Sequence, residues 1–364
     1  MFETPCLIID VPKMRNNIRL MAEMAERHGI HLRPHAKTHK LPSIAREQMA
    51  AGAVGITVAK ISEAEVMAEH GVNNIFIAYP LVVESKIERA IRLINSRSIH
   101  LVLGIDSFEG ASLMSQIAVR HGRTLNVRLE VDTGLKRTGV PFDNALRLAQ
   151  IIHVLPNLSL TGIYTFRGAL LNGQPTLDLE KAGMEEGQWM VKLADEMRAQ
   201  GIPIHEVSVG STPTSMYAAR IKGVTEVRPG TYVFYDRMQA QLGVTSLEDC
   251  AASILATVIS RPTVNYAVID GGSKTFATDV QPNTQPLQLK GFGHIAEASD
   301  AVLERLSEEH GMLRLEPHHS FQVGDRIHII PNHICSTLNL HNKVYLVDGD
   351  RIEEQPILAR GMLE

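Results

Sequence analysis

From about residue 31 to residue 234 the chain alternates short β-branched runs with longer helical patterns, and this alternation restricts the fold more than any other feature. Between the runs, apolar residues recur with helical spacing, as in SIAREQMAAG and DNALRLAQIIHVL. Strands that alternate with helices form parallel βαβ units, and eight units in about 210 residues are typical of a (β/α)8 barrel. A doubly wound sheet would carry a glycine fingerprint after its first strand, which this sequence lacks. The eight candidate strands are HLRPHAK, VGITVAK, NIFIAYP, HLVLGID, NVRLEVD, LTGIYTF, HEVSVGS and TEVRPGTYVF.

After this region the pattern changes to closely spaced strand segments, among them ILATVISRP, DRIHIIPNH and KVYLVDGDRI. These predict a C-terminal domain that is mostly β and resembles a β-barrel. We therefore expect an α/β chain with a (β/α)8 barrel over residues 11–243 and a β domain over residues 244–364. Residues 1–10 precede the barrel pattern, and we expect them to join the β domain.

Charge and cysteine content exclude several classes of protein. The chain has 36 basic and 40 acidic residues and a formal net charge of −4, so it lacks the basic footprint of a nucleic-acid-binding protein. No segment approaches the roughly 18 unbroken apolar residues of a membrane span, and the N-terminus does not resemble a signal peptide. The three cysteines are widely spaced and odd in number, unlike a secreted disulfide framework. We expect a cytoplasmic protein with no membrane partner.

The stretch RPHAKTHK, residues 33–40, places a lysine among cationic neighbours at the end of the first candidate strand. In an extended segment Arg33, His35, Lys37 and His39 would share one face. Cationic neighbours and partial burial both lower the pKa of a lysine, which frees its amine to attack a carbonyl. A solvated basic loop is the alternative. Barrel active sites lie at the C-terminal ends of the strands, so the position of Lys37 favours a chemical role.

Two loops after the seventh and eighth candidate strands, SVGSTPT and EVRPGTYVF, combine glycines with hydroxyl side chains. Barrels commonly bind phosphate at these two loops, through backbone N–H groups and hydroxyls. Either loop alone could be an ordinary turn. A lysine after the first strand together with such a phosphate site predicts a site for pyridoxal phosphate.

In the β domain, PNHICSTLNLH places His333 and Cys335 two residues apart. On a strand both would face the same side, where imidazole and thiolate could bind one zinc ion. Two protein ligands with open positions would suit a catalytic metal. The alternative is a core cysteine beside a surface histidine. A further segment, SEEHG, places His310 either in a solvated turn or near this metal.

The motifs RPHAKTHK, VDTGLKRTG, SVGSTPT, TEVRPGTYVFYD, SEEHG and PNHICSTLNL occur in this order along nearly the whole chain. Together they resemble the D-threonine aldolase and D-serine dehydratase family, which are pyridoxal phosphate enzymes of the alanine racemase fold type. The resemblance implies a barrel with a β domain, a homodimer and a small D-amino acid as substrate.

The resemblance also assigns residues. Lys37 would carry the cofactor as a Schiff base, and His333 and Cys335 would hold the divalent metal. The remaining cofactor-binding residues would be Arg137 near the pyridoxal hydroxyl, Tyr164 at the ring, and Ser211, Thr212, Gly230 and Thr231 around the phosphate.

The sequence departs from many family members after Tyr164, where it reads YTFRGALLNG. Arg167 in this segment could pair with a second substrate carboxylate, which would favour an acidic 3-hydroxy amino acid. His310 is the other candidate for substrate binding.

The preferred reaction is that of a lyase, the dehydration of D-serine or D-3-hydroxyaspartate to a keto acid and ammonia. In the family an H-x-C pair resembles the zinc-dependent dehydratases, whereas aldolases more often show H-x-D. Zinc is therefore the expected metal, with manganese or magnesium as alternatives. Three other functions stay open: a D-threonine or 3-hydroxy-D-aspartate aldolase, an amino acid racemase and a non-catalytic carrier of pyridoxal phosphate.

Overall fold

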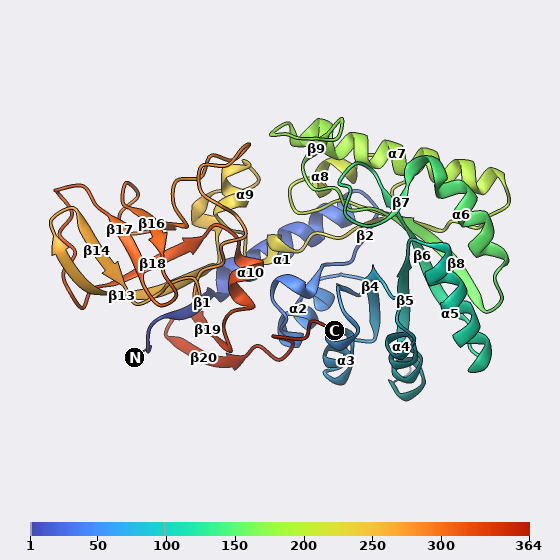
Figure 1. Cartoon of the computed structure of the whole chain (residues 1–364), viewed down its shortest axis with the longest axis horizontal. Coiled ribbons are helices and arrows are strands. Elements are labelled where there is room, and N and C mark those ends of the chain that lie inside the picture. The colour runs from blue at the N-terminus through green and yellow to red at the C-terminus, as the bar shows by residue number, and fades with distance from the viewer. Residues whose placement is uncertain (1, 98) are drawn as a thin grey trace. The chain divides into compact units, whose positions relative to one another are not determined.

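The computed structural model describes residues 2–97 and 99–364 (Figure 1). These residues fall into two compact units, which are described one at a time. The barrel unit comprises Arg19–Lys37, Leu41–Gly230 and Met362–Glu364, and the β unit comprises the chain up to Ile18 with Thr38–Lys40 and Thr231–Gly361. The chain passes from the barrel unit to the β unit between residues 230 and 231. The expected domain boundary at residues 243 and 244 lies later in the chain and stays a prediction.

Eight strands follow one another in the main sheet of the barrel unit, all of them parallel, in the order β2-β12-β11-β8-β6-β5-β4-β3. The two ends of this order also join, because the N–H of Val54 donates to the carbonyl of Leu32 at 2.9 Å and that of Thr57 to Pro34 at 2.8 Å. The sheet closes, and the predicted (β/α)8 barrel is confirmed. The strands are β2 (His31–Leu32), β3 (Ile56–Val58), β4 (Asn74–Pro80), β5 (His100–Ile105), β6 (Leu125–Asp132), β8 (Leu158–Tyr164), β11 (Glu206–Val209) and β12 (Glu226–Val227).

Helices follow the strands and cover the outer face of the sheet, as Figure 1 shows for α3 to α6. Because both faces are covered, the strands are continuous apolar runs rather than alternating ones, and β5 is buried from Leu101 to Ile105. The helices are the later part of α1 (Val11–Arg27), α2 (Pro42–Ala50), α3 (Ile61–Glu69), α4 (Glu84–Arg97), α5 (Phe108–Arg120), α6 (Phe142–Val154), α7 (Leu179–Ala199) and α8 (Ser215–Ala218). Short strands β7 (Val140–Pro141), β9 (Leu170–Leu171) and β10 (Gln174–Pro175) lie in the loops.

A buried carboxylate on β12 holds charged side chains from several strands of the barrel. Glu226 accepts from Arg33 Nε at 2.7 Å, from Arg128 Nη1 at 2.5 Å and from Ser208 Oγ at 2.5 Å. Arg228 in turn donates to Ser208 Oγ at 2.5 Å. Burial alone would raise the pKa of Glu226, but Arg128 and Arg33 outweigh burial and hold that pKa well below its usual range. Glu226 is therefore ionised and paired, and it links β12 with β6, β11 and the segment after β2.

The β unit contains a sheet with the strand order β16-β17-β14-β13-β1-β19-β20, and β18 pairs with both β13 and β15. Strand β1 pairs antiparallel with β13 and parallel with β19. The predicted mostly-β C-terminal domain is confirmed. Its strands are β1 (Cys6–Asp10), β13 (Ala252–Thr263), β14 (Tyr266–Ile269), β15 (Gly293–Ile295), β16 (Val302–Leu306), β17 (Gly311–Arg314), β18 (Arg326–Pro331), β19 (Lys343–Asp348) and β20 (Arg351–Pro356), and its short helices include α9 (Arg237–Gln241) and α10 (Ile334–Leu338).

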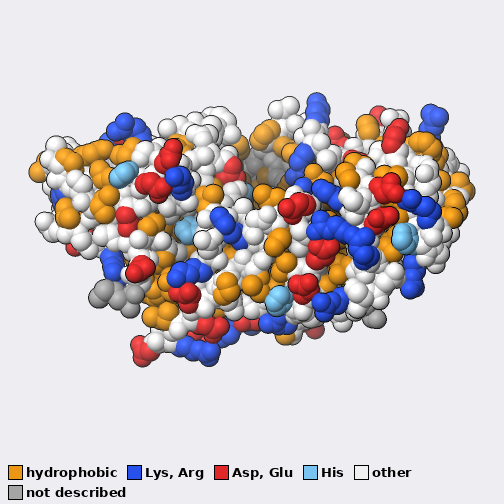
Figure 2. Space-filling model, turned by 60° about the horizontal axis from the view of Figure 1, so that its bottom comes forward, with side chains coloured by type: hydrophobic (Ala, Val, Ile, Leu, Met, Phe, Trp, Pro, Cys, Tyr) orange, Lys and Arg blue, Asp and Glu red, His pale blue; other side chains and the backbone are white. Residues whose placement is uncertain are grey.

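The surface carries both signs of charge. Figure 2 shows acidic and basic side chains interspersed over the face in view. Over the described residues, none of the helices combines the length and the apolar character that crossing a membrane requires. The cytoplasm as the location of the protein stays a prediction.

We predict that Glu226→Gln destabilises the barrel by about 3–5 kcal/mol at pH 7, because Arg33 and Arg128 would stay buried without their counter-charge. Differential scanning calorimetry would measure this as a lower transition temperature. Because the folded-state pKa of Glu226 is lowered, its contribution is fully present above the unfolded pKa of about 4.3 and is lost as the pH falls through the folded value.

Glu84→Gln is the matched control, since Glu84 forms an exposed ion pair with Arg120 at 2.5 Å. Its loss should lower the transition temperature far less, because an exposed ion pair contributes little to stability. Equal transition temperatures for the two variants would contradict the structural role of Glu226.

Candidate active site

The chain around Lys37 is extended only as far as His35 and then turns. Residues Ala36–Thr38 form a 3-10 turn, η1, directly after the parallel bridge between His35 and Thr57. The expectation of one extended face from Arg33 to His39 is therefore wrong beyond His35, since a helical turn does not alternate its side chains. Lys37 still follows the first barrel strand, at the end where barrel active sites lie.

Within the barrel unit, Phe166 brings two of the predicted cofactor residues together. The Nζ of Lys37 lies 5.3 Å from the centroid of the Phe166 ring, and the guanidinium of Arg137 lies 4.9 Å from the same centroid. Cations are attracted to the face of an aromatic ring at such distances. Phe166 therefore positions Lys37 and Arg137 although it carries no reactive group.

Tyr164 is fully buried at the end of β8, and its hydroxyl donates to Glu130 at 3.1 Å. Burial first, and Glu130 second, raise the pKa of Tyr164 well above its usual value. Gly104 on β5 makes room for this side chain, because a Cβ at Gly104 would clash with the Tyr164 hydroxyl oxygen. The place of Tyr164 at the cofactor ring stays a prediction.

Arg228 is a functional candidate that the sequence did not reveal. Its guanidinium lies 5.2 Å from the centroid of the Tyr164 ring, and Nη2 donates to the carbonyl of Thr165 at 2.5 Å. Arg228 thus braces the ends of β8 and β12 at the loops that carry the predicted cofactor residues.

A buried carboxylate accepts hydrogen bonds from the predicted phosphate loop after β11. Glu186 on α7 accepts from the N–H of Gly210 and from the hydroxyl of Thr214, both at 3.2 Å. Ser211 donates its N–H to the Thr214 hydroxyl at 3.0 Å. Gly210 has a φ of +79°, and a Cβ there would lie 3.1 Å from the Cα of Ser215. Burial raises the pKa of Glu186 to about 7.

In the β unit, His333 and Cys335 do not lie on a strand. His333 is the N-cap of α10 and Cys335 lies in the first turn of that helix. The predicted strand is wrong because buried Asp236 accepts the N–H of Ile334, between the two residues, at 3.0 Å and caps the turn. Even so, the two side chains lie within hydrogen-bonding reach of each other.

Asp279 orients His333. Its Oδ2 lies 2.6 Å from His333 Nδ1 and also accepts from Ser336 Oγ at 2.9 Å. Burial would lower the pKa of His333, but Cys335 and Asp279 outweigh burial and raise that pKa well above its usual value. Burial would raise the pKa of Cys335, but His333 lowers it. A carboxylate on one ring nitrogen of a histidine is the common support of a metal ligand, because it leaves the other nitrogen for the metal.

Two threonine hydroxyls lie beside the thiol of Cys335. Thr38 Oγ1 is 3.2 Å and Thr231 Oγ1 is 3.5 Å from Cys335 Sγ. Thr38 is the next residue after Lys37 in the chain, and Thr231 is the next residue after Gly230. Thr231, predicted at the phosphate, thus has its hydroxyl beside the thiol of Cys335, whereas Ser211 lies on the loop held by Glu186 and Thr212 follows it.

The two predicted substrate residues have partners of their own. Arg167 is fully buried, and its Nη2 binds Glu185 and the carbonyl of Leu170. His310 lies in the exposed turn between β16 and β17, with its Nδ1 3.5 Å from Ser307 Oγ.

The donors fit the groups that the sequence predicts. Cys335 offers a sulfur with a lowered pKa and His333 a ring nitrogen, which is a donor set suited to zinc. In the barrel unit, Lys37 offers a primary amine, and Ser211 offers a hydroxyl on a glycine loop after the seventh strand. These are the groups that bind pyridoxal and phosphate.

Comparison with known proteins agrees with this arrangement. Residues 9–238 match the family of the alanine racemase N-terminal domain, and residues 251–347 match a serine dehydratase domain. The chain is 34% identical to D-threo-3-hydroxyaspartate dehydratase of Delftia sp. (strain HT23), over 92% of this chain and 91% of the relative. It is 29% identical to D-threonine aldolase of Arthrobacter sp., over 99% and 93%. The solved structure of the Delftia enzyme has a TM-score of 0.90 with this chain, at 32% identity, covering 98% of this chain and 97% of that one.

We predict that iodoacetamide alkylates Cys335 first in chelator-treated protein at pH 7.5, and that zinc protects it. Cys335 has a lowered pKa, whereas burial raises the pKa of Cys6 to about 11 and that of Cys250 to about 12. Asp279→Asn should raise the zinc concentration needed for protection by about 10–100-fold. Peptide mass spectrometry measures the extent of alkylation at each cysteine.

Asp348→Asn serves as the control, because Asp348 pairs with Arg15 on the surface. Equal zinc requirements in the two variants would show that Asp279 does not support a metal ligand.

Proposed function

Because the chain belongs to the alanine racemase N-terminal domain family and continues into a serine dehydratase domain, we propose that it is a zinc- and pyridoxal phosphate-dependent dehydratase of D-3-hydroxy amino acids. The predicted D-threonine aldolase and D-serine dehydratase family and the lyase class are confirmed by the relatives. The choice of reaction, metal and substrate among these lyases is our proposal.

The observation that best supports a dehydratase is the thiol of Cys335 beside His333. A thiolate ligand selects zinc over the harder manganese and magnesium ions. Solved structures of D-threo-3-hydroxyaspartate dehydratase include a histidine-to-alanine mutant and a cysteine-to-alanine mutant whose positions are two residues apart, the latter in a metal-free form. His333 and Cys335 have the same separation.

Lys37 is the proposed base. Pyridoxal phosphate, when bound, supplies an electron sink that stabilises negative charge on the Cα of an attached amino acid. The Nζ of Lys37 would receive the Cα proton, and the ring of Phe166 holds that amine in place. Ser211, Thr212 and Gly230 would bind the phosphate through hydroxyl and N–H groups. Arg137 lies on the same Phe166 ring and would bind the pyridoxal hydroxyl.

His333 and Cys335 would hold a zinc ion that supplies Lewis acidity for the departure of the β-hydroxyl. Asp279 keeps His333 in the orientation that a ligand needs. Loss of the Cα proton and the β-hydroxyl as water leaves an enamine, which hydrolyses to a keto acid and ammonia. Because water leaves and water returns, the net reaction removes only ammonia from the amino acid.

The substrate class we propose includes D-threo-3-hydroxyaspartate and D-serine. Both compounds appear in the names of relatives that match most of this chain. Arg167 already has a carboxylate partner in Glu185, so a substrate carboxylate would have to compete with that ion pair. The roles of Arg167 and His310 in substrate binding and the homodimer stay predictions.

The second candidate function is that of an aldolase, because D-threonine aldolase of Arthrobacter sp. matches 99% of this chain.

We predict that the holoenzyme with zinc converts D-threo-3-hydroxyaspartate or D-serine to a keto acid and ammonia. Cys335→Ala should lower this rate more than about 100-fold while the visible absorbance of the bound cofactor persists. A lactate dehydrogenase or malate dehydrogenase coupled assay measures the keto acid. Cys6→Ala is the control, since Cys6 lies in a buried apolar cluster with Ile8 and Leu255.

Glycine and an aldehyde as the products would establish the aldolase instead. Undiminished keto acid formation by Cys335→Ala would remove the metal from the mechanism.

We predict that borohydride reduction of the holoenzyme fixes the cofactor to Lys37. Peptide mass spectrometry should find the modified lysine in the peptide that contains RPHAK, and Lys37→Arg should abolish the modification. The alternative lysines for cofactor attachment are Lys40 and Lys60. The Nζ of Lys60 lies 3.9 Å from the ring centroid of Tyr79. Cofactor on either of them would refute the assignment.

A further inference from the structure

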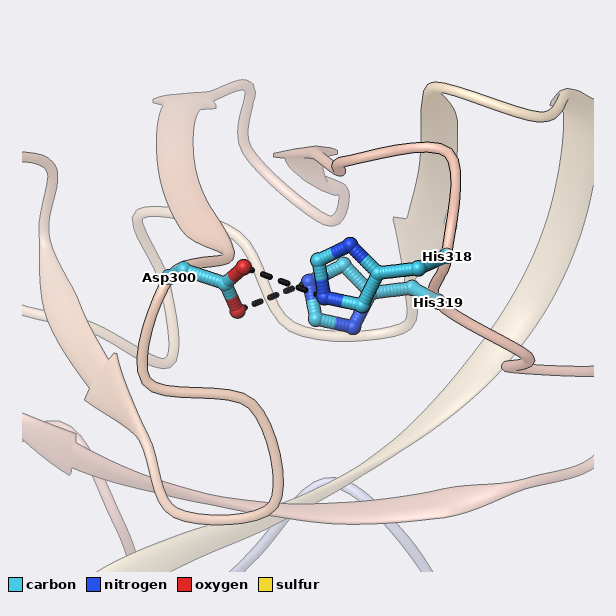
Figure 3. Close-up of side chains that lie close together, drawn as sticks. All are labelled: Asp300, His318 and His319. Atoms are coloured by element: carbon cyan, nitrogen blue, oxygen red, sulfur yellow. Dashed lines mark ion pairs between the residues drawn. The ribbon is translucent and has the colours of Figure 1, made fainter.

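The β unit contains a second group of side chains of the types that ligate metals, separate in sequence from His333 and Cys335. Figure 3 shows Asp300 facing the rings of His318 and His319, which lie side by side. The Nε2 of His318 lies 3.2 Å from Asp300 Oδ2, and the Nε2 of His319 lies 2.9 Å from Asp300 Oδ1. One ligand atom from each residue lies within 4.8 Å of the other two. Asp300 comes from the loop between β15 and β16, and both histidines come from the loop between β17 and β18.

The contact of His319 with Asp300 is short but is not a hydrogen bond. The His319 side chain is only 10% exposed, and its Nε2 has no hydrogen-bond partner among the described residues. A hydrogen bond needs the N–H to point at the oxygen, whereas two ligands of one ion both point at a third position. Ligands at 2.0–2.2 Å from a tetrahedral ion lie roughly 3.3–3.6 Å apart. The two histidine nitrogens lie 3.2 and 2.9 Å from the two oxygens of Asp300, slightly closer than this spacing.

The loop that carries the histidines is held in place by groups outside the cluster. Arg261 on β13 donates from Nη2 to the carbonyl of His319 at 2.5 Å and from Nη1 to the carbonyl of Phe321. The ring of Phe321 stacks on the ring of His319, with centroids 5.7 Å apart and planes 5° from parallel. Ligands that are already fixed lose less conformational entropy when an ion binds.

We propose that Asp300, His318 and His319 form a second divalent metal site, which takes zinc or a similar ion. Two imidazoles and a carboxylate suit zinc and nickel better than calcium or magnesium, which prefer oxygen ligands alone. Three protein ligands leave a fourth position for water. The ion would join the loop before β16 to the loop before β18, so its role is to stabilise the β unit. This site does not depend on the proposed lyase chemistry.

Counting bound zinc tests the proposal. Untagged full-length holoenzyme is treated with a chelator, reloaded with zinc and desalted, and the zinc in each chain is measured by inductively coupled plasma mass spectrometry. The wild type should retain two equivalents, and Cys335→Ala should retain one. The double variant His318→Ala/His319→Ala should also retain one, and the three substitutions together should retain none.

Two further variants guard against loss of folding and non-specific binding. Asp300→Asn keeps the shape of the side chain and should lose the same equivalent as the histidine pair. His121→Ala is the matched control, because His121 is an exposed histidine 3.9 Å from the single carboxylate of Glu88, and it should retain both equivalents. Circular dichroism checks that each variant is folded. In the Cys335→Ala background, zinc should raise the melting temperature, and Asp300→Asn should remove this shift.

The outcomes separate the two metal sites. A single equivalent in the wild type that disappears in Cys335→Ala would overturn the second site and leave the proposed catalytic metal intact. Two equivalents in the folded histidine double variant would also overturn it. A single equivalent that persists in Cys335→Ala and disappears in the histidine double variant would support this site and contradict a metal at His333 and Cys335.

Discussion

The barrel depends on one buried carboxylate. Glu226 pairs with both Arg33 and Arg128 in the interior, where an unpaired guanidinium would be costly. The same group fixes the segments from which the chemistry comes. Arg33 is four residues before Lys37 in the chain, and Ser208 is three residues before Ser211. Electrostatic pairing inside the barrel thus fixes the strand ends from which the loops with Lys37 and Ser211, the proposed cofactor-binding residues, begin.

The residues proposed to react are distinct from those that hold them. Lys37 and Ser211 are the proposed reactive and phosphate-binding residues, whereas Phe166 contacts Lys37 and Glu186 accepts a hydrogen bond from the loop that carries Ser211. Such supports are themselves anchored on regular elements, Glu186 on α7 and Phe166 directly after β8. Supporting residues on rigid elements keep a site within the small tolerances that catalysis requires.

The sequence predicted the barrel well because buried parallel strands leave a local pattern. The run NIFIAYP coincides with β4, and the order of eight runs reproduces the order of the barrel strands. The motif residues Lys37, His333 and Cys335 were visible because each lies in an unusual local segment. Their supports were not, because Asp279 lies 54 positions from His333 and Asp236 lies 98 positions from Ile334. The same long-range hydrogen bond from Ile334 explains why a segment rich in β-branched residues begins a helix rather than a strand.

Gly104 and Tyr164 have a consequence for how this sequence can change. The hydroxyl of Tyr164 occupies the space that a Cβ at Gly104 would need, so the two positions form one steric unit across β5 and β8. A larger residue at Gly104 is compatible with the fold only when a shorter side chain replaces Tyr164. The same Cβ would lie 3.0 Å from the backbone nitrogen of Tyr79 and 3.1 Å from the carbonyl oxygen of Ile77, so a shorter residue at position 164 removes only the tightest contact. Libraries that vary Gly104 alone will therefore find it intolerant, whereas libraries that shorten Tyr164 at the same time relieve the largest clash.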